Sequence, residues 1–95
     1  MTTLHTHQRV ANYDIWKRAF DQVLSSSLAV GLHSFRIWRG EDDASLVVVE
    51  YTFESREAAE SFVYNPAVLD EMTHAGVDET SVHLEFLDEV GFADL

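Results

Sequence analysis

Glu50 is the first residue in this chain whose type and position point to chemistry. It is the only charged side chain in the segment Leu46–Phe53, LVVVEYTF, which is otherwise almost entirely apolar. A strand that is apolar on both faces is typical of a strand buried on both faces. A carboxylate in such an interior needs a hydrogen-bonded partner or a function. Glu50 is therefore our first candidate for a general base.

Histidines are the second set of candidates, because imidazole is the side chain that titrates nearest neutral pH. His83 and His7 are predicted either to shuttle protons near Glu50 or to be ordinary strand residues, hydrogen-bonded within the sheet or exposed to solvent. Zinc accepts imidazole nitrogens and carboxylates, so the HxH pair that starts at His5 could bind a metal together with His83 and Glu50. The HxH spacing is too common to predict a metal by itself, and we expect none.

Composition restricts the classes of partner. The chain has 95 residues, 46% of them hydrophobic, and a formal charge of -11 from 17 acidic and 6 basic residues. One small folded domain is therefore expected. Binding of nucleic acid needs clusters of Lys and Arg, which this acidic chain lacks. An anionic membrane surface is disfavoured for the same reason. No apolar run approaches the roughly 20 residues of a membrane helix. With no signal-peptide pattern and no cysteine, we expect a cytoplasmic protein without nucleic acid or membrane partners.

Sequence motifs for cofactor binding are missing. The chain has no GxGxxG, phosphate-binding loop or GxSxG, so neither nucleotide-dependent nor serine-hydrolase chemistry is supported, and no cofactor is expected. The acidic residues Glu41, Asp42 and Asp43 are predicted to form a solvated turn, since no calcium-binding loop pattern surrounds them.

Hydrophobic periods of two and 3.6 residues predict the elements that position these side chains. Strands are predicted at residues 4–10, Leu32–Arg39, 45–53 and 80–88. Helices are predicted to begin after the caps Asn12 and Ser55, and the second to restart at Asn65-Pro66 and stop at Gly76. The order β-α-β-β-α-β is that of a ferredoxin-like α+β fold, a single antiparallel sheet with both helices on one face. The other face then needs a second cover, most simply a second copy of the chain.

Strand alternation divides the side chains between the helix face and an open face. The open face is predicted to carry, strand by strand, His5, His7 and Arg9; Ser34, Arg36 and Trp38; Leu46, Val48, Glu50 and Thr52; and Ser81, His83, Glu85 and Leu87. A one-residue bulge in the first strand would exchange His7 for Gln8. A hairpin across residues 40–44 places Arg36 near Val48 and diagonal to Glu50, within reach of a long side chain. Arg36 would then either stabilise an enolate or phenolate or form a structural ion pair with Glu50.

Three segments resemble the dimeric α+β barrel superfamily, in particular its antibiotic-biosynthesis-monooxygenase-like and small cyclase-like members. Residues 10–21 (VANYDIWKRAFD) are similar to the first helix of these proteins, residues 61–77 to their second helix with its Asn65-Pro66 kink, and residues 84–89 (LEFLDE) to their last strand. The resemblance implies a homodimer whose two sheets pack face to face as a barrel, and a place in secondary metabolism.

The resemblance also implies a cofactor-independent monooxygenase- or cyclase-like enzyme acting on an apolar, aromatic or polyketide-type small molecule inside the barrel. On this hypothesis the catalytic residues are Glu50, His83 and His7, and the substrate-binding residues are Arg36, Trp38, Val48 and Leu87. The alternative is a non-catalytic dimeric protein that binds a small ligand or assists a partner enzyme. Some haem-degrading relatives ligate iron near the second helix, where His74 lies, but the register does not match and no haem is expected.

Overall fold

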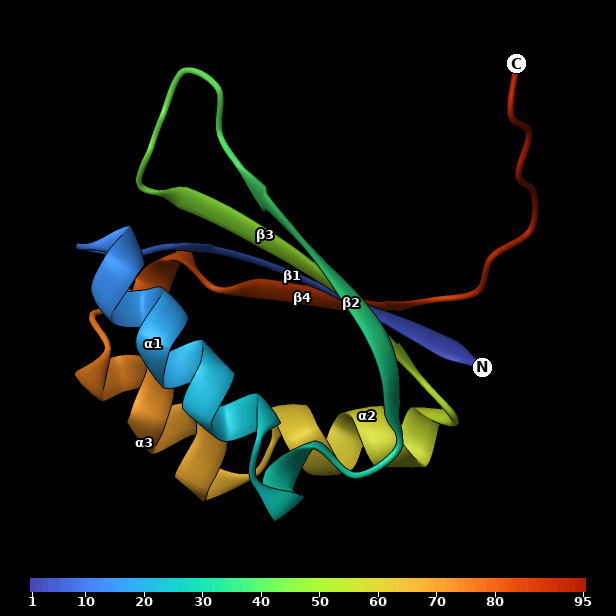
Figure 1. Ribbon diagram of the computed structural model, residues 1–95, viewed down its shortest axis with the longest axis horizontal. Coiled ribbons are helices and arrows are strands. Elements are labelled where there is room, and N and C mark those ends of the chain that lie inside the picture. Colours follow the sequence, from blue (N-terminus) through green and yellow to red (C-terminus); the bar gives the residue numbers. More distant parts are fainter.

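The computed structural model describes residues 1–95 and has the ferredoxin-like α+β architecture that the sequence predicts (Figure 1). In chain order the elements are β1 (Thr2–Arg9), α1 (Tyr13–Leu24), the 3₁₀ turn η1 (Ser27–Ala29), β2 (Leu32–Arg39), β3 (Leu46–Phe53), α2 (Arg56–Val63), α3 (Pro66–His74), the 3₁₀ turn η2 (Glu79–Ser81) and β4 (His83–Leu87). The four strands form one antiparallel sheet in the order β2-β3-β1-β4.

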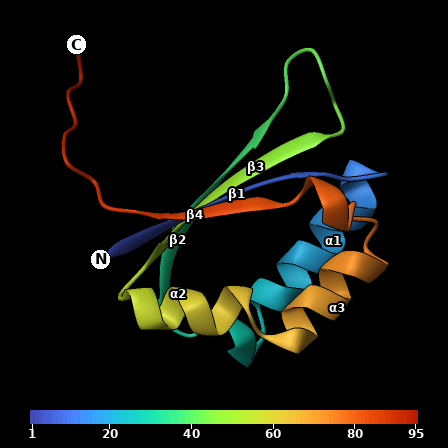
Figure 2. The same cartoon turned by 180° about the vertical axis from the view of Figure 1, so that it is seen from behind.

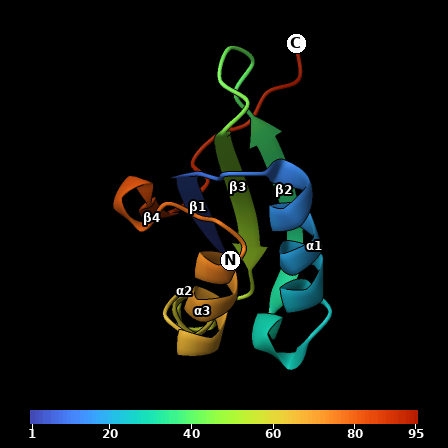
Figure 3. The same cartoon turned by 90° about the vertical axis from the view of Figure 1, so that its left-hand side faces the viewer.

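The helices cover only one face of this sheet. Figures 1 and 2 show α1, α2 and α3 on the same side, with no helix on the other, and Figure 3 shows α1 beside α3 in the helical layer. None of these helices could span a lipid bilayer, since the longest has 12 residues. One whole face of the sheet is therefore left uncovered in a single chain.

The helix ends lie where the sequence places them. The side chain of Asn12 accepts a hydrogen bond from the Ile15 amide at 3.1 Å and that of Ser55 one from Ala58 at 3.1 Å, so each satisfies an amide that the first turn leaves free. Asn65 caps α3, and Pro66 is the first residue of this helix. Gly76 ends this helix with φ +89°, a conformation that favours glycine. The predicted caps and stop are confirmed.

The core is an aromatic cluster between the sheet and the helices. Trp16 and Phe20 of α1 are fully buried and stack with ring centroids 4.9 Å apart. Phe20 meets the edge of Phe35 of β2 at 5.2 Å, and Tyr51 of β3 contacts Phe62 of α2 at the same distance. These rings connect α1 and α2 to β2 and β3, so packing determines which face of the sheet the helices cover.

The hairpin register differs from the prediction by two residues. Ser45 does not begin β3, because its amide and hydroxyl both donate to Asp43 Oδ1, at 3.0 and 2.6 Å, and hold it in the turn. The Gly40 amide then pairs with the Leu46 carbonyl at 3.1 Å, so the loop spans residues 41–45 instead of 40–44. As a result Arg36 lies opposite Glu50, not Val48, and Ser34 lies opposite Thr52.

The outer strand bounds also differ from the prediction. The first strand spans Thr2–Arg9 rather than residues 4–10, and Val10 makes only an isolated bridge. The last strand begins at His83 instead of residue 80, because Asp78 accepts hydrogen bonds from the Thr80 amide and hydroxyl, at 3.0 and 2.7 Å, and closes η2. The short polar side chain competes with the strand for the backbone.

The Asp43 turn predicts a specific dependence of stability on pH. Hydrogen bonds from Ser45, and then the Arg9 guanidinium, hold the pKa of the Asp43 carboxyl below its ordinary value of 3.8. A group with a lowered folded-state pKa stabilises the protein above its unfolded-state pKa and loses that effect as pH falls through the folded-state value. The difference in unfolding free energy between the wild type and Asp43→Ala should therefore be constant above about pH 5 and shrink below it. Urea titrations between pH 2 and 7 measure this.

The neighbouring substitution Asp42→Ala is the matched control, since Asp42 lies in the same loop and makes no hydrogen bond of its own. Its difference from the wild type should not follow the same pH profile. Identical profiles for both variants would show that net charge, not the Asp43 turn, produces the effect.

Candidate functional site

The open face of the sheet carries the polar residues that the sequence singles out. In β1 the side chains of Leu4, Thr6 and Gln8 are buried under the helices, so His5 and His7 project from the open face. The uncertainty about the first strand is thus settled for His7, and Gln8 lies in the core. In β4, His83, Glu85 and Leu87 lie on the open face in the same way.

Glu50 lies at the middle of this face, and its hydrogen-bond partner is Trp38. The indole Nε1 of Trp38 donates to Glu50 Oε1 at 2.8 Å across neighbouring strands. Glu50 is half-buried, whereas Trp38 is 49% exposed. One carboxylate oxygen is thereby oriented, and Oε2 has no partner within the chain.

Arg36 faces Glu50 directly but forms no ion pair with it, which corrects the predicted diagonal pairing. Its guanidinium lies 6.0 Å from the centre of the Trp38 ring, and it takes part in none of the ion pairs of the chain. The two-residue register shift puts Trp38, not Arg36, on the diagonal from Glu50, where a long side chain reaches best.

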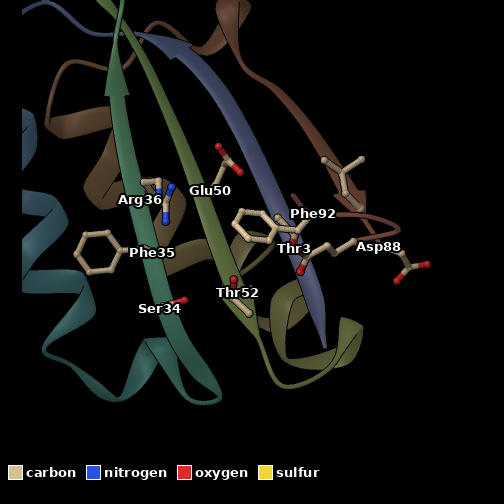
Figure 4. Close-up of a pocket in the computed structure, with 10 residues that line it drawn as sticks. Thr3, Ser34, Phe35, Arg36, Glu50, Thr52, Asp88 and Phe92 are labelled. Carbon is tan, nitrogen blue, oxygen red and sulfur yellow. The ribbon is translucent and has the colours of Figure 1, made fainter. Parts of the chain in front are cut away.

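A groove of about 680 Å³ lies over this part of the open face, and Figure 4 shows the residues that line it. Ser34 and Arg36 of β2 face Glu50 and Thr52 of β3 across it, while Phe35 points away from them (Figure 4). The full lining is Thr3, Ser34, Phe35, Arg36, Glu50, Thr52, Leu87, Asp88, Glu89 and Phe92. Three predicted site residues, Glu50, Arg36 and Leu87, are therefore brought together.

The other predicted site residues lie farther along the same face. His7 is paired in register with His83 on one side and with Val48 on the other, and Val48 in turn faces Trp38. His83 Nε2 contacts Glu85 Oε1 at 2.8 Å, and both side chains are more than half exposed. These residues form a row next to the groove without lining it.

His5, which the sequence suggests only as a possible metal ligand, is a direct neighbour of Glu50 on the open face. It stands between Glu50 of β3 and Glu85 of β4 in the ladder. The pairing of His5 with Glu50 depends on the register between β1 and β3, which hydrophobic alternation alone does not predict. No group of three or more His, Asp and Glu side chains is close enough to hold a metal ion.

His74 is remote from the groove. Its Nδ1 lies 2.8 Å from the Asp70 carbonyl oxygen, one turn earlier in α3, and the side chain is exposed beside α1. No bound group can bridge this imidazole and the open face of the sheet, because the helical layer and the sheet lie between them.

A second space lies in the core, between the sheet and the helices. This inner chamber has a volume of about 100 Å³, and most of its lining is aliphatic or aromatic. Its polar lining consists of Thr6, Gln8 and Tyr51. Leu69 and Val82 also line it and are about half exposed, so the chamber reaches the surface between α3 and the start of β4.

Two hydroxyl groups in the lining of the inner chamber, those of Thr6 and Tyr51, belong to buried side chains. The Thr6 hydroxyl is buried and has no hydrogen-bond partner, which is unusual for a native interior. Burial raises the pKa of the Tyr51 hydroxyl far above its ordinary value. The nearby Thr6 hydroxyl opposes that shift, although the two hydroxyls are not in hydrogen-bonding geometry. Tyr51 is therefore a neutral hydrogen-bond donor over the whole physiological pH range.

Thr6, Gln8 and Tyr51 are the functional candidates that the sequence analysis missed. The signal was present, because two of the three inward positions in the first strand are polar. Polar residues in a core-facing row indicate either a hydrogen-bond network or a ligand.

Comparison with solved structures finds proteins of similar fold, although no protein-family model and no curated protein matches the sequence. SnoaB, a cofactor-independent oxygenase from Streptomyces nogalater, superposes with a TM-score of 0.74 at 13% identity, covering 96% of this chain and 94% of that one. An antibiotic biosynthesis monooxygenase gives 0.72 at 10% identity, with 96% and 100% covered. Rv0793 from Mycobacterium tuberculosis gives 0.66 at 15% identity, with 99% and 100% covered. The chain therefore has the fold of the antibiotic-biosynthesis-monooxygenase-like proteins, the family that the sequence resembles.

Proposed function

We propose that this protein is a cofactor-independent oxygenase- or cyclase-like enzyme that works as a homodimer on a small apolar, aromatic or polyketide-type molecule. The observation that carries the proposal is Glu50, the one carboxylate of an apolar strand, held by Trp38 Nε1 at 2.8 Å in a groove on the uncovered face. The relatives in fold include a protein described as a cofactor-independent oxygenase.

The homodimer is supported by the surface that a single chain leaves in water. Trp38 and Leu87 are 49% and 41% exposed on the open face, where Val48 is also only half-buried. Large apolar side chains exposed on an uncovered sheet face are typical of an interaction site. A second copy laid on this face would remove water from the groove and enclose Glu50.

In the proposed reaction Glu50 removes a proton from an activated C–H of the substrate. Arg36, directly opposite and without an ion-pair partner, would stabilise the enolate or phenolate that results. In an oxygenation the carbon electron pair adds to dioxygen, a C–O bond forms, and the abstracted proton goes to the terminal oxygen to give a hydroperoxide. In a cyclisation the same electron pair attacks a carbonyl carbon of the same molecule, and the carbonyl oxygen receives the proton.

The row of His7 and His83 would carry protons between Glu50 and solvent. The two imidazoles are partners in the β1–β4 ladder, and histidine can both accept and release a proton near pH 7. Leu87 would supply an apolar wall of the substrate groove, and Trp38 and Val48 would supply the apolar surface beside it.

The test combines assembly with turnover. Light scattering of the purified chain should give the mass of a dimer at micromolar concentration. Incubation with small aromatic polyketide-type compounds should then consume dioxygen and add two oxygen atoms to the product, or convert a carbonyl to a ring hydroxyl without a change in mass. The thermally unfolded chain is the control. A monomer, or a dimer that converts no member of such a panel, would contradict the proposal.

The inner chamber favours a second candidate function, the non-catalytic binding of a small apolar molecule. Its polar lining contains only neutral groups, so it has hydrogen-bond donors and acceptors but no base. An apolar cavity with a few convergent polar groups is typical of a ligand site. Native mass spectrometry of the freshly purified chain tests this candidate, because a copurified small molecule should be displaced by Val68→Trp, which fills the chamber, and retained by Glu50→Gln.

A further inference from the structure

One wall of the inner chamber, helix α3, is packed more weakly than the others. Three of its side chains, Val68, Leu69 and Met72, line the chamber, more than any other helix or strand contributes. Side chains that border a cavity lose the dispersion contacts that a filled core provides. Val68 is the only buried residue of α3, whereas α1 and α2 bury three residues each. Packing therefore holds α3 to the fold less firmly than it holds the other helices.

Both ends of α3 separate it from its neighbours in the chain. Pro66, its first residue, has no amide hydrogen, so no helical hydrogen bond runs from it back to α2. The segment that follows Gly76 is tied to the end of β1. The Ala11 amide donates to the Gly76 carbonyl at 3.0 Å, and the Asp78 amide donates to the Arg9 carbonyl at 2.9 Å. A movement of α3 can thus stop at its two ends, without displacing α2 or β4.

The entrance of the chamber lies along the same helix. Leu69 of α3 and Val82, just before β4, both line the chamber and are 51% and 44% exposed. Deeper in the chamber is the Thr6 hydroxyl, which has no hydrogen-bond partner although the side chain is only 8% exposed. An unpaired hydroxyl at that depth is unusual. A molecule that enters beside α3 would reach it and could pair with it.

The lining of the chamber restricts the charge of such a molecule. Its polar side chains, Thr6, Gln8 and Tyr51, carry no charge, and the rest of the lining is apolar. An ion in these surroundings would lose its hydration without gaining a group of opposite charge, which costs far more than the burial of a neutral polar group. The chamber is therefore suited to an uncharged molecule.

We propose that α3 is a movable cover of the inner chamber, which opens as one unit between Pro66 and Gly76 and admits a small neutral molecule whose polar group pairs with Thr6. This inference rests on the second candidate of the proposed function, ligand binding in the chamber, and adds to it the route of entry and the charge of the ligand. Glu50 and the open-face groove take no part in it.

Thiol labelling of Thr6→Cys measures the opening, because the natural chain has no cysteine. Methyl methanethiosulfonate, a small neutral reagent, should label this thiol about a hundredfold or more faster than it labels Val49→Cys. Val49 is the cross-strand partner of Thr6, is fully buried and does not line the chamber. Its thiol should therefore react only when the whole domain unfolds. Equal rates for the two thiols would overturn the cover and ligand entry together.

A pair of substitutions at Asp70, added to Thr6→Cys, tests whether α3 is the part that opens. Asp70 is exposed in the middle of the helix. Glycine weakens a helix relative to alanine, so Asp70→Gly should be labelled about fivefold faster than Asp70→Ala. The same pair at Arg18, exposed in the middle of α1, should give equal rates. Fast labelling that does not differ between the Asp70 variants would refute α3 as the cover, while binding in the chamber would stand.

Two reagents of the same shape test the charge of the ligand. (2-Trimethylammonium)ethyl methanethiosulfonate is cationic, and 3,3-dimethylbutyl methanethiosulfonate is its neutral counterpart. The acidic chain attracts cations, so slower labelling by the cationic reagent can come only from the chamber. Relative to the exposed thiol of Val30→Cys, the cationic reagent should label Thr6→Cys about tenfold or more slowly than the neutral one. Equal relative rates would overturn the selection of a neutral molecule.

Hydrogen exchange of the unmodified chain gives a measurement that needs no variant. Amides of α3 should exchange through a local opening whose free energy changes little in dilute urea, because little surface is exposed. Amides of α1 and α2 should exchange through larger openings, which urea promotes strongly. Exchange of α3 only in concert with α1 and α2 would contradict a separate opening of α3.

Discussion

Replacing Glu50 with glutamine is expected to lower kcat about 10²- to 10⁴-fold, the usual contribution of a positioned general base. Glutamine keeps the length of the side chain, and its carbonyl oxygen can still accept the 2.8 Å hydrogen bond from Trp38 Nε1. The variant therefore loses the base and retains the geometry. Initial rates of dioxygen uptake or ring closure measure the effect, with circular dichroism and light scattering to show that fold and assembly are unchanged.

Glu85→Gln is the matched control for this variant. Glu85 is also an open-face carboxylate, in β4, and its contact is with His83 at 2.8 Å instead of with the groove. Glutamine at this position can still hydrogen-bond with His83, so the substitution should lower kcat far less than Glu50→Gln. Equal rates in Glu50→Gln and the wild type would remove Glu50 from the chemistry and favour a structural role at the interface. An equal loss of kcat in both variants would indicate that the total negative charge of the open face, and not Glu50 as a base, determines the rate.

The fold was predictable because several independent local signals agreed. The caps Asn12 and Ser55, the restart at Asn65-Pro66 and the stop at Gly76 each act within one turn of helix, so they can be read without knowledge of the tertiary structure. The faces of the strands followed from alternation, which depends only on the pleat. Agreement between local signals and global pattern is what makes a sequence specify one fold.

The hairpin register was not predictable from alternation, because a shift of two residues leaves every side chain on the same face. The register depends on the hydrogen bonds that Ser45 donates to Asp43, which hold Ser45 out of the strand and shift the loop by one residue without changing its length. For that reason Arg36 and Glu50 could be placed on one face, but their contact could not. Trp38 became the partner of Glu50 through the same two-residue shift.

The inner chamber was missed for a different physical reason. Its volume depends on how side chains from six helices and strands fail to fill the core, and a one-dimensional pattern contains no information on packing of that kind. Only the polar residues Thr6 and Gln8 in an inward-facing row hinted at it. Their presence in a small core has an energetic cost that packing alone does not explain.

That cost leads to the second large expected effect, an increase in stability when Thr6 is replaced with valine. Valine has nearly the same shape as threonine and suits a strand, and the substitution removes a buried hydroxyl that has no partner. An unsatisfied buried hydroxyl destabilises a protein by about 1–3 kcal/mol. For a domain of this size each kcal/mol raises Tm by about 4–8 °C. Thermal unfolding followed by circular dichroism measures the gain.

Thr3→Val provides the control, because Thr3 belongs to the same strand and faces the open groove, where its hydroxyl can meet water. The same change of atoms there should leave Tm nearly unchanged. A lower Tm for Thr6→Val would show that the hydroxyl is satisfied in solution, by Tyr51 or by water in the chamber. A higher Tm together with weaker ligand retention would mean that the chain keeps an unpaired hydroxyl because a ligand uses it. In that case stability and binding compete at one residue, and Glu50 and the inner chamber become separable parts of the same protein.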